Sequence, residues 1–239
     1  MNGFDNENLN EKDGESFGNE IFAEQQSEQS VENNLLDEQK NMREQAVAVH
    51  SKRRKYILGI ATSGIFIAFM IISAFISIPI GTIKITMQFL VANVCALLLG
   101  KKWGTISLVL YLALGLIGLP IFSSGGGPAY VLQPSFGYII GFAIGGFFAA
   151  WYREKRGKYT FSTYMIASLI NLVIMDIFGT VYGAVIMYGY MHSSMGVWAF
   201  FVAFLLPFIP IDIAKSVVGS LICTKLGPMY DKKYKAYDN

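Results

Sequence analysis

Hydrophobic residues dominate the chain from Tyr56 onward, where long apolar runs alternate with short polar breaks. These runs cover residues 56–78, 86–100, 104–119, 135–152, 161–190 and 196–224. Because a helix needs about 20 apolar residues to cross about 30 Å of hydrocarbon, the pattern predicts six membrane-spanning helices. The second and third runs are short, which predicts that they pack inside the bundle or end in re-entrant loops.

Composition agrees with a membrane protein of the all-α class. Hydrophobic residues make up 53% of the 239 residues and charged residues only 15%, which is outside the range of ordinary soluble domains. No cleavable secretory signal opens the chain, so the first hydrophobic helix is expected to direct insertion. We therefore predict a multi-pass protein of the cell membrane, surrounded by lipid and without a nucleic-acid partner.

The first fifty residues differ from the rest in charge and in pattern. They hold twelve acidic and three basic side chains, a net charge of −9, whereas residues 51–239 have a net charge of +11. Glu, Asn, Gln and Ser are frequent there and no apolar period is sustained, as in disordered segments. We expect a disordered acidic cytoplasmic tail over 1–50, with a marginal helix over 31–49, and a membrane-embedded domain over 51–239. A regulatory or partner-binding arm is the alternative for the tail.

Lysine and arginine lie almost entirely on one side of the predicted six-helix topology. That side carries Lys52, Arg53, Arg54, Lys55, Lys101, Lys102, Arg153, Lys155, Arg156, Lys158, Lys225, Lys232, Lys233 and Lys235. The opposite side carries only Lys84. Because positive residues are retained on the cytoplasmic side, both termini are predicted to be cytoplasmic.

The most informative polar feature is an acid and a base inside the last apolar run. Asp212 and Lys215 follow the segment Pro207-Phe208-Ile209-Pro210. An ionisable residue at the centre of a membrane helix costs roughly 2.5–3.5 kcal/mol on insertion scales, so it indicates a functional site. Residues three apart share a helix face, so both side chains can point into one cavity and bind a ligand with polar donors and a negative charge. A purely structural ion pair is the alternative interpretation.

Two groups of small residues carry weaker signals. Gly125, Gly126 and Gly127 lie in the external loop before residue 135, where they fit either a lid over a pocket or a plain connecting turn. Small residues four apart allow helix backbones to approach closely in lipid. Gly137, Gly141, Gly145 and Ala149 have this spacing and predict tight packing within the bundle, whereas Gly59, Ser63, Gly64 and Ala68 in the first helix are candidates for docking another membrane subunit.

The chain offers little for catalysis or for a metal. His50 lies in the tail and His192 in an external loop, so no histidine lies in a helix interior. No GxxxxGK[ST] phosphate loop is present, and Cys95 and Cys223 fall within apolar runs as small core residues. Asp176 is the other intramembrane acid; it lines the same cavity as Asp212 or makes a capping or interhelical hydrogen bond. We therefore predict a protein that is not an enzyme and has no cofactor.

Four stretches of this chain resemble the BioY family, the biotin-binding S components of energy-coupling factor (ECF) transporters. They are Ile85-Thr86-Met87-Gln88, the run from Tyr111 to Pro120 with Phe122, the run from Pro134 to Tyr138, and Pro207 to Lys215. The resemblance covers about 57–224 and implies the six-transmembrane-helix bundle of an S component. Ser135 and Phe136 depart from the usual Thr-Gly-Gly-Tyr of the family, which adds bulk at the expected pocket mouth.

Biotin, the ligand implied by the resemblance, suits the polar residues of these stretches. Its ureido ring offers two N–H donors and a carbonyl acceptor, and its valerate tail ends in a carboxylate. Asp212 would accept from the ureido group and Lys215 would donate to an acceptor or balance charge. The other expected contacts are polar ones from Gln88, Thr86, Gly125, Gly126 and Gly127, and aromatic walls from Tyr111, Phe122 and Tyr138.

The resemblance also implies partners: an ECF transmembrane coupling protein and two cytoplasmic ATPase subunits, all separate from this chain. Two alternatives remain open from the residues. An S component for another vitamin would share the six helices but would not need the acid and base at this position. A proton-coupled secondary transporter would use Asp176 and Asp212 to carry protons, although no internal repeat supports it.

Overall fold

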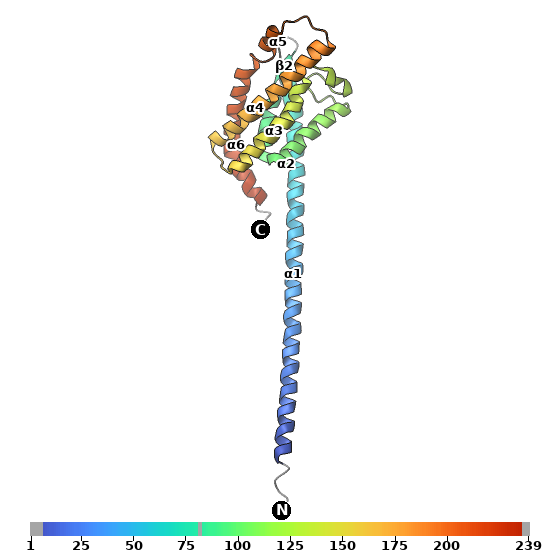
Figure 1. Cartoon of the computed structure of the whole chain (residues 1–239), viewed down its shortest axis with the longest axis vertical. Helices are drawn as coiled ribbons and strands as arrows, with labels where there is room; N and C mark the ends of the chain where they lie inside the picture. Colours follow the sequence, from blue (N-terminus) through green and yellow to red (C-terminus); the bar gives the residue numbers. More distant parts are fainter. Residues whose placement is uncertain (1–6, 81–82, 236–239) are drawn as a thin grey trace, which may run out of the picture. The chain divides into compact units, whose positions relative to one another are not determined.

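The computed structural model describes residues 7–80 and 83–235, and it divides the chain into Met1–Arg53 and Arg54–Asn239. The sequence predicts a nearby boundary, with the tail over 1–50 and the membrane domain over 51–239. The elements in chain order are α1 (Glu7–Phe75), β1 (Ser77–Ile80), β2 (Ile83–Thr86), α2 (Gln88–Ile117), η1 (Pro128–Leu132), α3 (Phe136–Arg156), α4 (Phe161–Ala184), η2 (Val185–Tyr190), α5 (Val197–Phe204) and α6 (Phe208–Lys235), as Figure 1 shows.

The first unit is helical from Glu7, whereas the sequence predicts disorder over 1–50; residues 1–6 lie outside the described part. Every side chain described between residues 32 and 50 is exposed, and Leu35, Met42 and Val49 are each more than half exposed. No burial of apolar surface supports this stretch. Its helix therefore depends on local propensity, which is a weak source of stability for an isolated helix.

Helix α2 folds back on itself at Gly100. The side chains of Gln88 and Tyr111 are joined by a hydrogen bond of 2.6 Å, although 23 residues of straight helix would separate them by roughly 35 Å. Gly100 has a φ of 76°, which favours glycine, and a Cβ atom there would press against the Glu154 carboxylate. The predicted segments 86–100 and 104–119 are the two arms of this one element.

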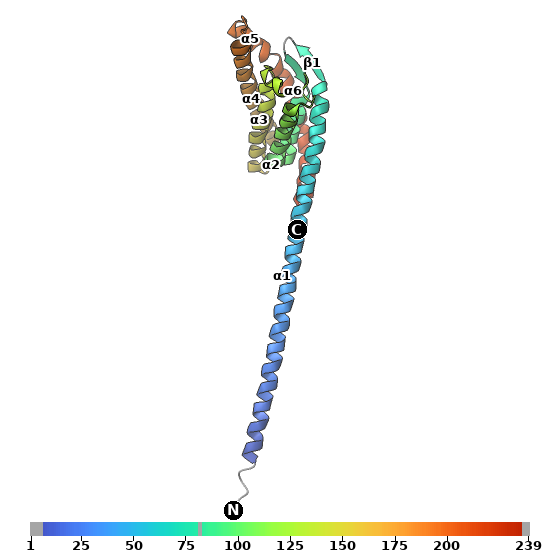
Figure 2. The same cartoon turned by 90° about the vertical axis from the view of Figure 1, so that its right-hand side faces the viewer.

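Helices α3 and α4 pack with their backbones in close approach. A Cβ atom added at Gly137, Gly141 or Gly145 would collide with the backbone or Cβ atoms of α4. The four-residue spacing of these glycines predicted this contact, and the structure confirms it. Figures 1 and 2 show α3 and α4 running side by side.

A buried polar cluster joins α2, α4 and α6 in the middle of the second unit. Asn93 donates to Ser168 (2.7 Å) and accepts from Asn171 (3.1 Å), and Ser168 hydrogen-bonds Ser220 (3.1 Å). All four residues are fully buried. Because polar groups in an apolar interior must find partners, this cluster restricts how the three helices can be arranged.

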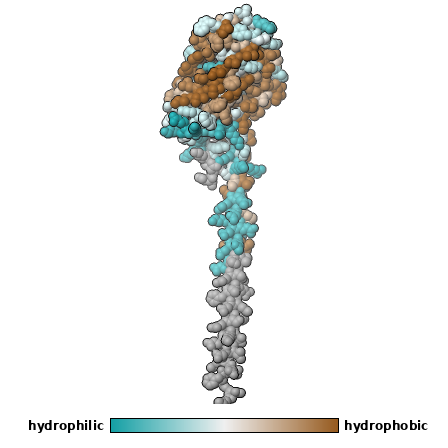
Figure 3. Space-filling view, viewed as in Figure 1, coloured by the Kyte–Doolittle hydropathy of each residue, from teal (hydrophilic) through white to brown (hydrophobic). Residues whose placement is uncertain are grey.

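The outer surface of the second unit is apolar. Exposed large hydrophobic residues lie along α1, α4 and α6, and Figure 3 shows them as a broad hydrophobic face. Four helices within the described residues are long and apolar enough to cross a membrane: Glu32–Phe75, Gln88–Ile117, Phe161–Tyr190 and Val197–Lys232. Helix α3 is not among them, and the predicted run 196–224 is divided between α5 and α6. The structure is therefore a mostly helical membrane protein.

Replacement of Gly141 by leucine is expected to destabilise the fold by about 1–3 kcal/mol, because the new side chain must push α4 away from α3. Thermal unfolding in detergent measures this effect as a lower Tm. Gly64→Leu is the matched control, since a Cβ atom at Gly64 meets nothing within 4 Å. An unchanged Tm for Gly141→Leu would contradict the close packing of the two helices.

Candidate functional site

A cavity lies where β2, the start of α2, α3, α4 and α6 converge. Its lining comprises Lys84, Thr86, Gln88, Phe89, Ser123, Tyr130, Ser135, Tyr138, Ile139, Phe142, Met175, Phe208, Asp212 and Lys215. Five of the predicted substrate-binding residues are in this set: Thr86, Gln88, Tyr138, Asp212 and Lys215. Residues more than 100 positions apart in sequence are thus brought to one place.

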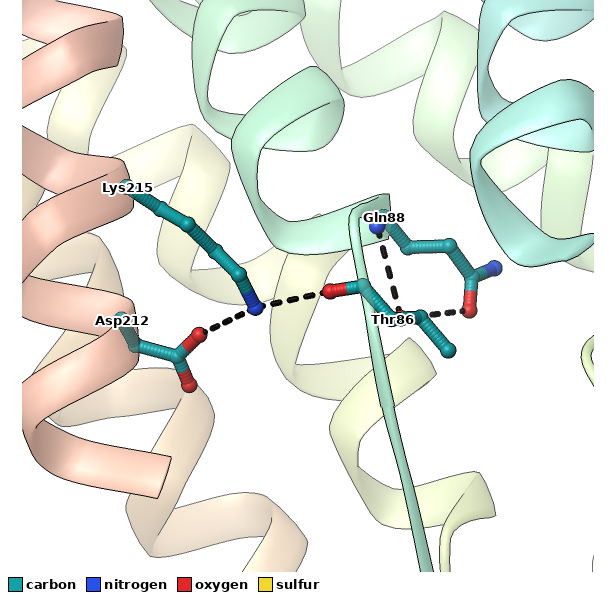
Figure 4. Close-up of polar contacts among 4 residues, drawn as sticks. All are labelled: Thr86, Gln88, Asp212 and Lys215. Atoms are coloured by element: carbon teal, nitrogen blue, oxygen red, sulfur yellow. Dashed lines mark hydrogen bonds and ion pairs between the residues drawn. The ribbon is translucent and has the colours of Figure 1, made fainter. Parts of the chain in front are cut away.

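The inner, polar end of the cavity is built on the ion pair of α6. Lys215 Nζ lies 2.7 Å from Asp212 Oδ1, and both residues are buried, with 7% and 4% of their surface exposed. The same ammonium donates to the backbone carbonyl of Thr86 at 2.7 Å, which ties α6 to β2 (Figure 4). An ammonium has three donors and a carboxylate several acceptor sites, so both groups can still bind a ligand.

Gln88 is held in place by a chain of hydrogen bonds. Thr86 Oγ1 donates to Gln88 Oε1 (3.2 Å), Gln88 Nε2 donates to the Tyr111 hydroxyl (2.6 Å), and Tyr111 donates to the carbonyl of Ile121 (2.8 Å). Figure 4 shows the Thr86 carbonyl facing Lys215, with the Gln88 side chain on the other side of the Thr86 backbone. Tyr111 does not line the cavity. It lies behind Gln88 and positions it, which sequence reasoning did not distinguish from a direct contact.

The apolar walls of the cavity come mainly from aromatic side chains. Tyr138 stacks on Phe208 with ring centroids 6.3 Å apart, and Phe89 lies against Phe142 at 6.5 Å. Sequence reasoning named Tyr138 but missed Phe89, Phe142 and Phe208. Helical spacing would have found two of them, because Phe142 is one turn after Tyr138 and Phe208 one turn before Asp212. Ser135 lines the cavity as expected, whereas Phe136 is buried in the core.

Gly125, Gly126 and Gly127 belong to the loop between α2 and η1, which we call the glycine loop. This loop packs on the end of α2, and none of its three glycines lines the cavity. Gly127 donates to the carbonyl of Gly115 (2.7 Å), and Gly125 and Phe122 exchange two backbone hydrogen bonds. Gly125 and Gly127 have φ angles of 111° and 100°, which favour glycine. Gly126 packs against the carbonyl of Leu119. The three glycine amides and Phe122, predicted as direct contacts, therefore shape the loop that brings Ser123 and Tyr130 to the cavity.

The outer end of the cavity is bridged by one hydrogen bond. Lys84 Nζ donates to the carbonyl of Ser123 at 2.7 Å, which joins β2 to the glycine loop. Lys84 is exposed, in contrast to Lys215. The site thus has an open cationic end and a buried end with a paired charge.

Asp176 does not line the cavity, although its neighbour Met175 does. It lines a separate apolar groove between α4 and the α5–α6 segment, together with Thr180. Asp176 is 8% exposed, and its Oδ1 has no hydrogen-bond partner among the described residues. The structure therefore shows neither alternative considered from the sequence: Asp176 does not share the cavity of Asp212, and its Oδ1 makes no capping or interhelical hydrogen bond among the described residues.

The predicted docking residues of α1 face in two directions. Gly59 and Ser63 are buried, and Gly59 lies directly under the Trp103 ring. Gly64 and Ala68 are exposed on the outer face of the helix. Only the second pair is therefore available to another subunit.

Comparison with known proteins gives a consistent result. Residues 42–232 match the model of the BioY family. A curated biotin transporter BioY of Thermotoga maritima is 36% identical over 167 residues, which are 69% of this chain and 92% of that protein. One from Lactococcus lactis is 33% identical over 172 residues, 69% of this chain and 87% of the relative. The crystal structure of the S-component for biotin from an ECF-type ABC transporter superposes with a TM-score of 0.64 at 30% identity, covering 74% of this chain and 97% of that one.

Replacing Lys215 by methionine is expected to destabilise the ligand-free protein by about 3–5 kcal/mol, because the Asp212 carboxylate would stay buried without its cation. The double variant Asp212→Asn, Lys215→Met removes both charges and is expected to recover most of this loss. Unfolding in detergent measures both variants. Equal destabilisation by the single and double variants would show that the pairing of the two charges is not what stabilises this end of the cavity.

Proposed function

The chain belongs to the BioY family, and we propose that it functions in biotin uptake by binding biotin in the cavity between β2, α2, α3, α4 and α6. The observation on which this proposal mainly rests is the buried Asp212–Lys215 pair at the polar end of that cavity. A charged pair in a membrane interior has a desolvation cost that a binding role explains. The choice of biotin is supported by the relatives, which are named biotin transporters, and by the similar crystal structure, which is of an S-component for biotin.

The ureido ring of biotin fits the polar end. Asp212 accepts hydrogen bonds from the ureido N–H groups, and Lys215 donates to the ureido carbonyl with its remaining donor. The Gln88 side chain, fixed by Thr86 and Tyr111, is a further polar part of the cavity lining. Since all these groups are held by other contacts before the ligand arrives, little ordering entropy is lost on binding.

The thiophane ring and the methylene tail fit the apolar walls. Tyr138 and Phe208 form one wall, and Phe89 and Phe142 form another. Burial of apolar surface supplies binding free energy of roughly 25 cal/mol per Å². The glycine loop acts on this site indirectly in our proposal, by holding Ser123 and Tyr130 at the outer end.

We propose six membrane segments, with the two arms of α2 counted separately. Contacts at the Gly100 bend support the orientation with both termini in the cytoplasm. The amide of Lys101 donates to Glu154 at 2.7 Å, and Arg153 pairs with Asp231 at 3.0 Å. These contacts gather the basic clusters of α2, α3 and α6 at one end of the bundle, as the positive-inside rule requires of a cytoplasmic face.

The energy for uptake is proposed to come from separate chains: an ECF transmembrane coupling protein and two cytoplasmic ATPases. The similar crystal structure supports this, because it is of one component of an ECF-type ABC transporter. Gly64 and Ala68 on the outer face of α1 are small and exposed, so the backbone of a partner helix can approach α1 closely at these two positions. The acidic segment 1–50, most of which precedes the family match at residue 42, is proposed as a cytoplasmic extension.

Equilibrium binding of biotin to the purified protein in detergent tests the proposed substrate. We expect tight binding by the wild type, a loss of at least about tenfold in affinity for Asp212→Asn and Lys215→Ala, and no binding of thiamine. Absence of biotin binding by folded wild-type protein would reject the proposed function. Retained affinity in both variants would assign the ion pair a structural role.

Docking is tested by Gly64→Leu with Ala68→Leu. Because both residues face outward, we expect unchanged biotin affinity and loss of most ATP-driven uptake in proteoliposomes with the complete transporter. Gly189→Leu is the matched control, since Gly189 also has open space around it. Full uptake by the α1 variant would place the docking surface elsewhere.

A further inference from the structure

Within the lining of the cavity as described, two side chains are cationic, Lys84 and Lys215. Lys215 is committed to Asp212 at 2.7 Å, so this pair is neutral as a unit. Biotin is an anion at neutral pH because its tail ends in a carboxylate. A ligand carboxylate placed beside Lys215 would put two carboxylates on one ammonium, and like charges at that distance repel each other. The carboxylate therefore needs the other cation.

Lys84 lies where it can bind the ligand carboxylate. Lys84 and Thr86 are two residues apart on β2, so their side chains share a face and lie about 7 Å apart along the strand. The carbonyl of Thr86 contacts Lys215, whereas Lys84 is nearer the hairpin turn and exposed. The two ammonium groups thus lie toward opposite ends of the cavity. A ligand with its ureido ring at Asp212 extends its tail toward Lys84.

The contact between Lys84 and Ser123 is compatible with this role. The Lys84 ammonium uses one donor on the Ser123 carbonyl, at 2.7 Å, and has two more. It can therefore donate to a carboxylate without releasing the loop. The ligand would then be held by the same group that joins β2 to the glycine loop.

We propose that Lys84 binds the valerate carboxylate of biotin at the outer end of the cavity and so selects the free acid over neutral derivatives. This inference rests on the proposed function, because it assumes that biotin occupies the cavity. It adds a residue that was considered from the sequence only for membrane orientation. It also fixes the direction of the ligand, with the ureido ring inside and the tail outside.

The test compares biotin with biotinamide, in which a neutral carboxamide replaces the carboxylate, by equilibrium binding to purified full-length protein. We expect the wild type to prefer biotin by roughly tenfold, the gain of a charge-assisted hydrogen bond over a neutral one. Lys84→Met should reduce this preference to about one by weakening biotin binding alone, since the amide does not depend on the charge. Lys84→Arg should retain it. Lys102→Met is the matched control for loss of a lysine, because Lys102 does not line the cavity.

The outcomes separate this inference from the proposed function. If the wild type binds neither ligand, the proposed function fails. If it binds both equally, or if Lys84→Met keeps the full preference for biotin, the role of Lys84 is rejected while the function stands. If Lys215→Met removes the preference and Lys84→Met does not, the carboxylate lies at the inner end and the ligand direction is reversed.

Discussion

The whole site depends on one electrostatic constraint, the burial of a carboxylate and an ammonium inside an apolar helical bundle. Asp212 and Lys215 neutralise each other across 2.7 Å, and Lys215 also binds the carbonyl of Thr86. Either charge alone would be strongly unfavourable in such surroundings. Because the pair must stay together and must reach β2, the position of α6 relative to the start of α2 is fixed. The remaining polar residues of the cavity are arranged around that fixed point.

The fold supports this arrangement from two directions. Below the cavity, the buried cluster of Asn93, Asn171, Ser168 and Ser220 joins the three helices that contribute Gln88, Met175 and the ion pair. Above it, the glycine loop is held on the end of α2 by the contact of Gly127 with Gly115. Polar contacts of this kind substitute for hydrophobic association, which is absent between helices in lipid. The cavity is therefore formed mainly by residues of helices and of β2, with Ser123 and Ser135 contributed by connecting loops.

Asp176 is a second buried acid with a different environment. It faces the groove beside α5 and has no basic partner in the described part of the chain, whereas Asp212 has Lys215. The two aspartates therefore differ in role because Asp212 has a cation within hydrogen-bonding distance and Asp176 does not, among the described residues. This separation favours ligand binding at Asp212 over a relay of protons between the two acids.

The sequence by itself determined the apolar segments, the excess of positive charge on one side, the acid and base on one helix face and the resemblance to biotin-binding S components. These features are local or compositional, so a linear pattern is enough to reveal them. The tertiary structure decided which of the candidate site residues line the cavity. The bend of α2 at Gly100 places Tyr111 behind Gln88, where it holds the Gln88 side chain. Phe122 and the three glycines lie beside the lining and shape the loop that carries Ser123. Lys84 lines the cavity because β2 places it beside Ser123. Gly59 is buried against Trp103 whereas Gly64 is exposed, because the two residues lie on different faces of α1. Contacts between distant segments depend on how helices bend and pack, and spacing along the chain does not encode that geometry.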